Sequence, residues 1–331
     1  MDWGQIFVIS ITAMVGSTTI IYALAALGLN IQFGYTGLLN FGQAGFAAIG
    51  AYSVAVVTAT LGQSLWLSIF IGLIGAVIFG LILGIPTLRL RADYLAIVTI
   101  AAAEVIRQTV RSVSLNEYFG GSDGITGKYA REFYSFNPFD QAISWGPIQF
   151  NSAQASWITV VGWVLIGLIV LLTWLLVRSP WGRVVKSIRE DENASRSLGK
   201  NVYFYKMQAL ILGGVVGSLA GIYWAIDAQS VQPDNYSSRF TFFAYTILIL
   251  GGAARVFGPV VGSIIFWFIL VFIGESLTQL VATGIIPDTI LRSDQIGQVR
   301  FMLVGLALML LIVYRPQGIF GDKRELALDD R

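Results

Sequence analysis

The chain has 331 residues, of which 56% are apolar and only 12% are charged, and its formal net charge is +2. After Asp2 the next charged residue is Arg89, a run that no soluble domain of this size could bury, whereas a bilayer span needs only about 20 apolar residues. The chain has no cysteine and no histidine, which excludes disulfides, thiolate chemistry, histidine acid–base catalysis and metals bound by these side chains.

The charge-poor stretches predict an all-α integral membrane protein, a polytopic helical bundle of about eight or nine transmembrane helices with broken or re-entrant segments. We expect a single transmembrane domain over residues 1–331. The N-terminal stretch reads as a retained first span, because it has neither the basic region nor a clear cleavage site of a signal peptide. The predicted spans are 5–29, 38–60, 64–86, 93–113, 156–177, 207–227, a broken pair near 240–254 and 258–275, and 297–314.

The basic residues predict which loops face the cytoplasm. The segment 178–206 carries seven lysines and arginines and three acidic residues, whereas the loop 114–155 carries two basic and four acidic residues. The positive-inside rule places 178–206, the turn at 88–92 and the tail 315–331 in the cytoplasm, and the loop 114–155 outside. The N-terminal side lacks basic residues, which fits a start outside the cytoplasm and an odd number of crossings.

The first candidate functional segment covers residues 34–45, where four glycines and several polar side chains lie at or near membrane depth. Irregular backbone at that depth is tolerated only where it is buried in protein or lines a cavity. The segment is therefore either part of a translocation pathway or a turn followed by a close-packed face of small residues. The pathway interpretation concerns Gly34, Tyr35, Thr36, Gly37, Asn40 and Gln43.

The second candidate is the break between two apolar stretches at residues 251–259. Two such interruptions, one in each half of the chain, are expected where a transporter contains an internal repeat. The alternative is an ordinary cytoplasmic turn that exposes Arg255. The pathway interpretation concerns Gly251, Gly252, Gly258 and Pro259.

Glu104 is the third candidate. It lies 11 residues after Asp93, about 16 Å along a helix and hence near the middle of a bilayer. Ionisable groups at that depth are functional candidates. The alternative, which we favour over contact with a substrate, is a buried polar network built on a pair with Arg107 three residues later.

Three glycines, Gly213, Gly217 and Gly221, recur at every fourth position. They lie on one face of the predicted helix, where the lack of side chains lets a second helix approach closely. We interpret them as packing residues.

The segment 179–201 predicts one or two short amphipathic helices beneath the membrane. The apolar residues of 184–188 share one face, and Ala194 and Leu198 form a second apolar patch. Such an element either rests on lipid or docks into a groove on a partner. The acidic residues 190–192 favour docking.

Eight short motifs follow one another along the chain from about residue 20. They cover residues 27–30 with 34–37, 93–99, 103–107, 120–125, 179–183, 188–194 with 198–199, 250–252 with 258–259, and 315–321. In this order they make the chain similar to the permease family of ABC importers for branched-chain amino acids, the LivM-type subunit. Residues 1–19 carry no motif of this family.

The resemblance implies a transport subunit of the plasma membrane that is not itself an enzyme. Its implied partners are a homologous second permease subunit, two cytoplasmic ABC ATPase subunits that bind ATP and Mg, and an extracytoplasmic substrate-binding protein. No cofactor or metal would belong to this chain. The family also includes permeases for urea, short-chain amides and other amino acids, so the substrate stays open.

The resemblance also implies roles for two regions. The segments 34–43 and 251–259 would border the translocation pathway. The coupling to an ATPase would use Ile188, Arg189, Glu190, Asp191, Glu192, Ala194, Leu198 and Gly199.

Two other classes of function compete with this interpretation. An ion-coupled secondary transporter would use Glu104 or Asp227 as its coupling carboxylate, but it has no need of a docking element at 180–199. An intramembrane enzyme would have to work with carboxylate, serine or tyrosine chemistry, and the sequence shows no paired constellation of these groups.

Overall fold

The structure is a computed structural model, and it describes residues 2–89, 92–127, 130–146, 148–286, 292–314 and 318–320. These residues are mostly helical, which confirms the predicted all-α fold. Of the expected tail 315–331, only 318–320 are among the described residues, and Arg91 of the basic turn lies outside them.

The α-helices of the described residues are α1 (Trp3–Val15), α2 (Ser17–Leu29), α3 (Gln43–Ala55), α4 (Leu65–Thr87), α5 (Ala92–Arg111), α6 (Asn116–Phe119), α7 (Arg131–Ser135), α8 (Ala153–Arg178), α9 (Pro180–Glu190), α10 (Glu192–Ser197), α11 (Val202–Ala228), α12 (Ser238–Gly251), α13 (Gly258–Ala282) and α14 (Ile296–Tyr314). Two π-helical turns, η1 (Asn30–Gly34) and η2 (Val56–Thr60), extend α2 and α3. Short 3-10 turns are η3 (Val113–Leu115), η4 (Pro233–Tyr236) and η5 (Ser293–Gln295).

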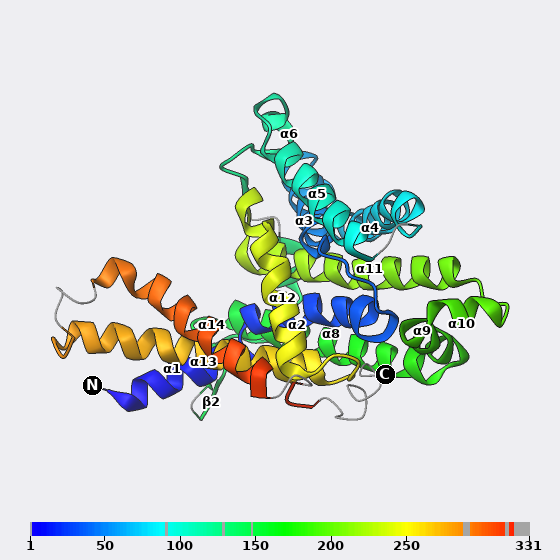
Figure 1. Cartoon of the computed structure of the whole chain (residues 1–331). Coiled ribbons are helices and arrows are strands. Elements are labelled where there is room, and N and C mark those ends of the chain that lie inside the picture. Colours follow the sequence, from blue (N-terminus) through cyan, green and yellow to red (C-terminus); the bar gives the residue numbers. More distant parts are fainter. Residues whose placement is uncertain are drawn as a thin grey trace.

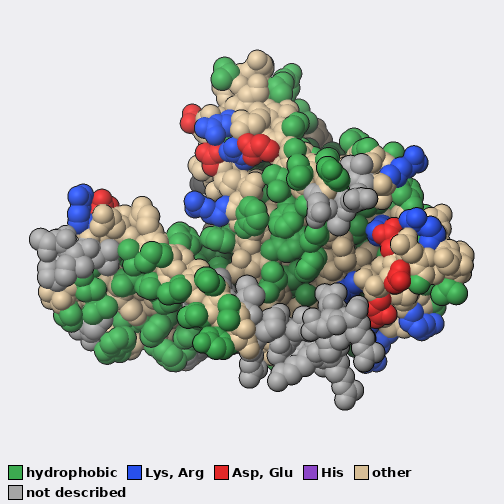
Figure 2. All heavy atoms as spheres, in the orientation of Figure 1, with side chains coloured by type: hydrophobic (Ala, Val, Ile, Leu, Met, Phe, Trp, Pro, Cys, Tyr) green, Lys and Arg blue, Asp and Glu red, His purple; other side chains and the backbone are tan. Residues whose placement is uncertain are grey.

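The helices α2 and α11 form the centre of the bundle. In the apolar stretch formed by α2 and η1, 83% of the residues are buried, and in that of α11, 72% are buried. The corresponding shares are only 33% in α4 and 28% in α8. The two outer helices present Phe70, Ile82 and Leu168 on the surface. Apolar side chains cover much of the visible face over α12, α13 and α14 (Figure 2). Such a surface fits contact with lipid.

The three glycines of α11 pack as the sequence predicts. A side chain on Gly213 would overlap the carbonyl oxygen of Gly28 in α2, and one on Gly221 would overlap that of Ala47 in α3. A side chain on Gly217 would overlap Gln43. The missing side chains therefore let α2 and α3 approach α11 closely.

Among the described residues, six helical segments have the length and the apolar composition needed to cross a membrane. They are 17–34, 43–60, Leu65–Thr87, Ala153–Arg178, Val202–Ala228 and Gly258–Ala282. The helices α1 and α12 are apolar but shorter. The residues of the predicted span at 93–113 form α5, a helix of 20 residues that carries Glu104, Arg107 and Arg111 and is not one of these six segments. The predicted total of eight or nine crossings stays a prediction.

The single span predicted at 5–29 is wrong, because the chain breaks at Gly16. This residue has extended backbone angles (φ −71°, ψ 170°) that end α1 and precede α2. The two helices then pack on different neighbours. The first lies along α13, where the Asp2 N–H donates to Gln279 Oε1 at 2.8 Å, and the second enters the core.

The helices α1, α13 and α14 lie together at one side of the molecule, and α9 and α10 lie at the opposite side (Figure 1).

Four two-residue strands occur in the described residues. The antiparallel pair β1 (Ile125–Thr126) and β4 (Ser230–Val231) ties the 114–155 loop to the linker after α11, and β2 (Ser144–Trp145) pairs with β3 (Ile148–Gln149) inside the loop. The loop and the linker therefore share one end of the bundle.

Candidate functional site

The two interrupted segments that the sequence singles out meet in space at Asn30. This residue begins the π-helical turn at the end of α2 and is completely buried. Its Nδ2 donates to the carbonyl oxygen of Arg255 at 2.8 Å, and its Oδ1 accepts from the N–H of Ala254 at 2.9 Å. One amide thus satisfies two backbone polar groups of the loop between α12 and α13. Single π-helical turns are frequent at functional sites.

The loop held by Asn30 has an unusual backbone. Ala254 has a φ of 61°, one of two positive values among the described non-glycine residues. That conformation costs an alanine about 1 kcal/mol. The contacts that hold Ala254, such as its hydrogen bond to Asn30, must offset this cost. Gly34 makes the contact possible, because a side chain there would overlap Asn30 Oδ1 and press on the N–H of Ala254.

The glycines of the second segment let α12 turn tightly into α13. A side chain on Gly251 would overlap the carbonyl oxygen of Gly258, and one on Gly258 would overlap that of Gly252. Pro259 lies in the first turn of α13, where its fixed φ suits the helix. Beyond α14 the chain returns to this point, since the Ile319 N–H donates to the Leu250 carbonyl oxygen at 2.9 Å.

The amphipathic segment also reaches this place through Arg189. Its Nη1 donates to the carbonyl oxygen of Gly34 at 2.7 Å, so the end of α9 is joined to the end of the π-helical turn. The next glycine, Gly37, has a φ of 73° and packs against the Arg189 side chain. We call the place where Asn30, Gly34, Arg189, Ala254 and Arg255 meet the junction.

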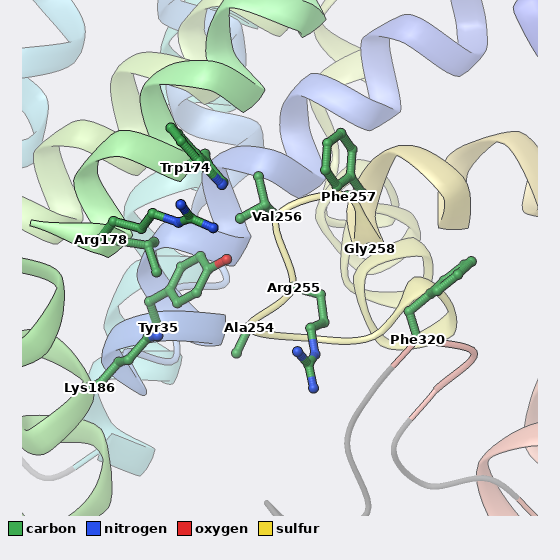
Figure 3. Close-up of a pocket in the computed structure, with 11 residues that line it drawn as sticks. Tyr35, Trp174, Arg178, Lys186, Ala254, Arg255, Val256, Phe257, Gly258 and Phe320 are labelled. Carbon is green, nitrogen blue, oxygen red and sulfur yellow. The ribbon is translucent and has the colours of Figure 1, made fainter.

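A cavity of about 580 Å³ opens beside the junction. In Figure 3, Tyr35, Arg178 and Trp174 lie on one side of the loop that carries Ala254, and Phe320 lies on the other. The Arg178 guanidinium stacks on the Trp174 ring, 4.0 Å from its centroid. The cavity therefore has aromatic walls, and its lining residues include three cationic side chains, Arg178, Lys186 and Arg255.

Asn40 and Gln43 are completely buried and hydrogen-bonded in a network that holds the 35–42 segment in place. Asn40 Nδ2 donates to Gln32 Oε1 at 2.8 Å, and Gln32 Nε2 donates to the Leu210 carbonyl oxygen at 2.9 Å. Gln43 Nε2 donates to the Gly213 carbonyl oxygen at 3.1 Å. Thr36 is also buried and donates to the carbonyl oxygen of residue 31. In this structure the network fixes the segment against α11.

The predicted coupling segment forms two helices with different exposure. In α9, Val185 and Ile188 are buried against the bundle. In α10 and just after it, Ala194, Leu198 and Gly199 are exposed, and the Leu198 side chain is 80% accessible. The first helix is thus anchored, and the second presents an apolar side chain to the surface.

The acidic residues 190–192 have separate positions. Glu190 is exposed. Asp191 is the residue before α10 and caps it, because its carboxylate accepts from the Ala194 N–H at 2.9 Å. Glu192 pairs with Arg196 at 2.9 Å and with Lys206 of α11. Acidic and basic side chains gather around these helices in Figure 2.

Glu104 lies away from the junction. It pairs with Arg107 at 2.6 Å, as the i, i+3 spacing predicts, and Arg107 also pairs with Asp234 at 2.6 Å. The network is not buried as expected, because the Glu104 side chain is 39% exposed. Asp234 precedes α12, whereas Gly251 ends it, and a helix of that length spans about 20 Å. The structure therefore brings together the candidates of 34–37, 189 and 251–259, but not Glu104.

Three residues of these contacts had no functional role predicted from the sequence: Asn30, Gln32 and Asp234. Asn30 and Gln32 could have been found as amide side chains in an otherwise apolar stretch, because a buried amide must find partners. Asp234 had no comparable signal, since its contact with Arg107 joins residues that are far apart in the sequence.

Comparison with known proteins decides the family. A family model described as "Branched-chain amino acid transport system / permease component" matches residues 11–313. The chain belongs to this family. With its long apolar helices, this permease is a multi-pass protein of the plasma membrane.

Individual permeases are similar over most of the chain. The permease protein LivM of the high-affinity branched-chain amino acid transport system of Escherichia coli is 29% identical, over 95% of this chain and 71% of that protein. The permease protein LivH of Salmonella typhimurium is 24% identical, over 92% of each chain. The guanosine ABC transporter permease protein NupQ of Bacillus subtilis is 24% identical, over 78% of this chain and 85% of that protein.

Proposed function

We propose that this permease forms one half of the membrane path of an ABC importer for branched-chain amino acids. The name of the LivM relative supports the substrate class, and the similarity to LivH supports a homologous permease as the second half. Two cytoplasmic ATPase subunits bind ATP and Mg, and an extracytoplasmic binding protein delivers the substrate. The chain itself holds no cofactor.

The observation that carries the proposal is the junction. The exposed α10 and Leu198 offer a docking surface for an ATPase, and the anchored α9 leads from it to Arg189. Arg189 is bonded to Gly34, and Asn30 in the same π-helical turn is bonded to the loop at Ala254. A displacement of the docking helices therefore reaches both interrupted segments through direct hydrogen bonds.

We propose that the interrupted segments form the cytoplasmic gate of the pathway. The docking helices, the 34–43 segment and the 251–259 loop then face the cytoplasm, and the 114–155 loop lies outside, with the N-terminus outside and the C-terminus inside. The pathway side chains are those of 34–43 and 251–259. Irregular backbone suits a gate because its carbonyl and amide groups can bind the polar ends of a substrate.

Purification of the tagged chain from its native membrane, followed by mass spectrometry, tests the assembly. We expect one further permease of this family and two ATPase chains in the purified complex. Recovery of the chain alone, in gentle detergent and at full yield, would contradict the proposed function.

A further inference from the structure

A second cavity lies at the opposite end of α12 from the junction. Its volume is about 470 Å³, within the range of small-molecule sites. Its walls include Tyr22, Trp224, Asp234, Arg239, Phe240 and Phe243. The cavity thus combines an aromatic surface with one cationic and one anionic side chain.

The aromatic wall is built by α2, α11 and α12. The Phe240 ring lies 5.1 Å from the Tyr22 ring and 5.8 Å from the Trp224 ring, between centroids. Phe240 is 1% exposed and Tyr22 is 8% exposed, so this wall is firmly packed. Packed aromatic rings offer a preformed apolar surface to an aliphatic side chain.

The Arg239 guanidinium is available to an anion. Arg239 is exposed and forms no ion pair or hydrogen bond within the described part of the chain. Its guanidinium lies over the Phe301 ring, 5.9 Å from the ring centroid. It lies in the first turn of α12, and Ser237, the residue before this helix, makes no side-chain cap. The helix N-terminus adds a partial positive charge and free N–H groups.

Tyr22 supplies an independent sign of a ligand. It lines the cavity, it is more than nine-tenths buried, and its hydroxyl has no hydrogen-bond partner in the described residues. The hydroxyl therefore makes no bond within the described protein that a ligand in the cavity would have to break. A carboxylate beside Arg239 would accept its hydrogen.

Asp234 can receive the opposite charge. Arg107 and Arg111 both bind its Oδ1, at 2.6 Å and 3.2 Å. Among the described residues, nothing donates to Oδ2. The two arginines therefore position the carboxylate and leave one oxygen for an ammonium group.

We propose that this cavity binds the α-amino acid on its way through the permease. Arg239, the first turn of α12 and the Tyr22 hydroxyl bind the carboxylate, Asp234 Oδ2 binds the ammonium group, and the rings of Trp224, Phe240 and Phe243 contact the aliphatic side chain. This site rests on the proposed function and assigns the permease a selectivity of its own: it accepts a zwitterion with an apolar body and rejects a nucleoside.

Cysteine protection tests the site directly, because the chain has no cysteine of its own. Ser237 and Asn235 also line the cavity, so Ser237→Cys and Asn235→Cys each place one thiol in its wall. Ser135 is exposed in the 114–155 loop, so Ser135→Cys is the matched control. The full complex in proteoliposomes is treated with a membrane-impermeant maleimide, and labelling is followed on this chain.

We expect L-leucine to slow labelling of the two cavity thiols and not of the control. At about 10 mM leucine, a site with a dissociation constant of about 1 mM gives about tenfold protection. L-Leucinamide, which lacks the carboxylate, and guanosine should give none. Adding Arg239→Gln should abolish the protection by leucine, whereas Arg292→Gln, an exposed arginine paired with Asp294, should leave it unchanged.

The outcomes separate the two proposals. If the wild-type complex does not import leucine with ATP, the proposed function fails. If it imports leucine but leucine protects neither cavity thiol, or if guanosine protects them and leucine does not, the amino acid site is wrong and the importer stands.

Discussion

Arg189 donates a hydrogen bond to the carbonyl oxygen of Gly34, 2.7 Å away. The bond joins an amphipathic surface helix to a π-helical turn at the end of the most buried helix of the bundle. Through Asn30, the same turn holds the loop between α12 and α13. This hydrogen bond thus lies directly between the proposed ATPase dock and the proposed gate.

Arg189→Ala should uncouple the permease. We expect leucine uptake per ATP hydrolysed to fall about tenfold, as for loss of one hydrogen bond from a charged donor, while the ATPase subunits stay bound. Arg183 lies on the same helix and is exposed, so Arg183→Ala is the control and should keep the wild-type ratio. Equal ratios in both variants would remove Arg189 from the coupling path.

Leu198→Arg should weaken docking of the ATPase. Leu198 is 80% exposed and touches little of its own chain, so the change should leave the fold intact and reduce the ATPase recovered with the tagged permease. Val113, which follows the C-terminal end of α5, is 89% exposed. The control Val113→Arg should therefore have no effect on the amount of ATPase recovered. Full recovery with Leu198→Arg would place the dock elsewhere.

Asn30→Leu should destabilise the permease by about 2 kcal/mol, because the N–H of Ala254 and the carbonyl of Arg255 both lose their partner. The thermal unfolding midpoint in detergent measures this. Thr109→Val removes one exposed hydrogen bond on α5 and should change the midpoint little. An unchanged midpoint for Asn30→Leu would show that water replaces the amide without cost.

Gly221→Ala and Gly167→Ala should have different effects on the thermal unfolding midpoint. A methyl group on Gly221 overlaps the Ala47 carbonyl oxygen, whereas nothing lies within 4 Å of the position it would take on Gly167. The first change should separate α11 from α3 and lower the midpoint. The second should be neutral or stabilising by up to about 1 kcal/mol, and similar losses in both would contradict the packing argument.

Glu104→Gln should keep ATP-driven uptake within about twofold, since partly exposed ion pairs contribute little and the glutamine oxygen still accepts from Arg107. A secondary transporter that used Glu104 as its coupling carboxylate would lose gradient-driven uptake altogether. Uptake by the variant with ATP, and with an ion gradient but no ATP, distinguishes these cases.

The helices could be read from the sequence because charge-poor stretches have few alternatives in a bilayer. The break at Gly16 could not be read from the sequence. A continuous apolar stretch has the same composition whether it forms one helix or two helices that pack on different neighbours. The pair of Glu104 with Arg107 is local and was predicted, whereas the contact of Arg107 with Asp234 needs the folded chain. Likewise both interrupted segments were recognised, but only the structure shows that Asn30 joins them.

The measurement that tests the account most directly is uptake of radiolabelled L-leucine by the complex purified through a tag on this chain and reconstituted in liposomes with its binding protein. We expect uptake to require ATP and to persist after ionophores collapse the proton and sodium gradients. Uptake that an ion gradient drives without ATP, and that ionophores abolish, would contradict the account and make this chain a secondary transporter.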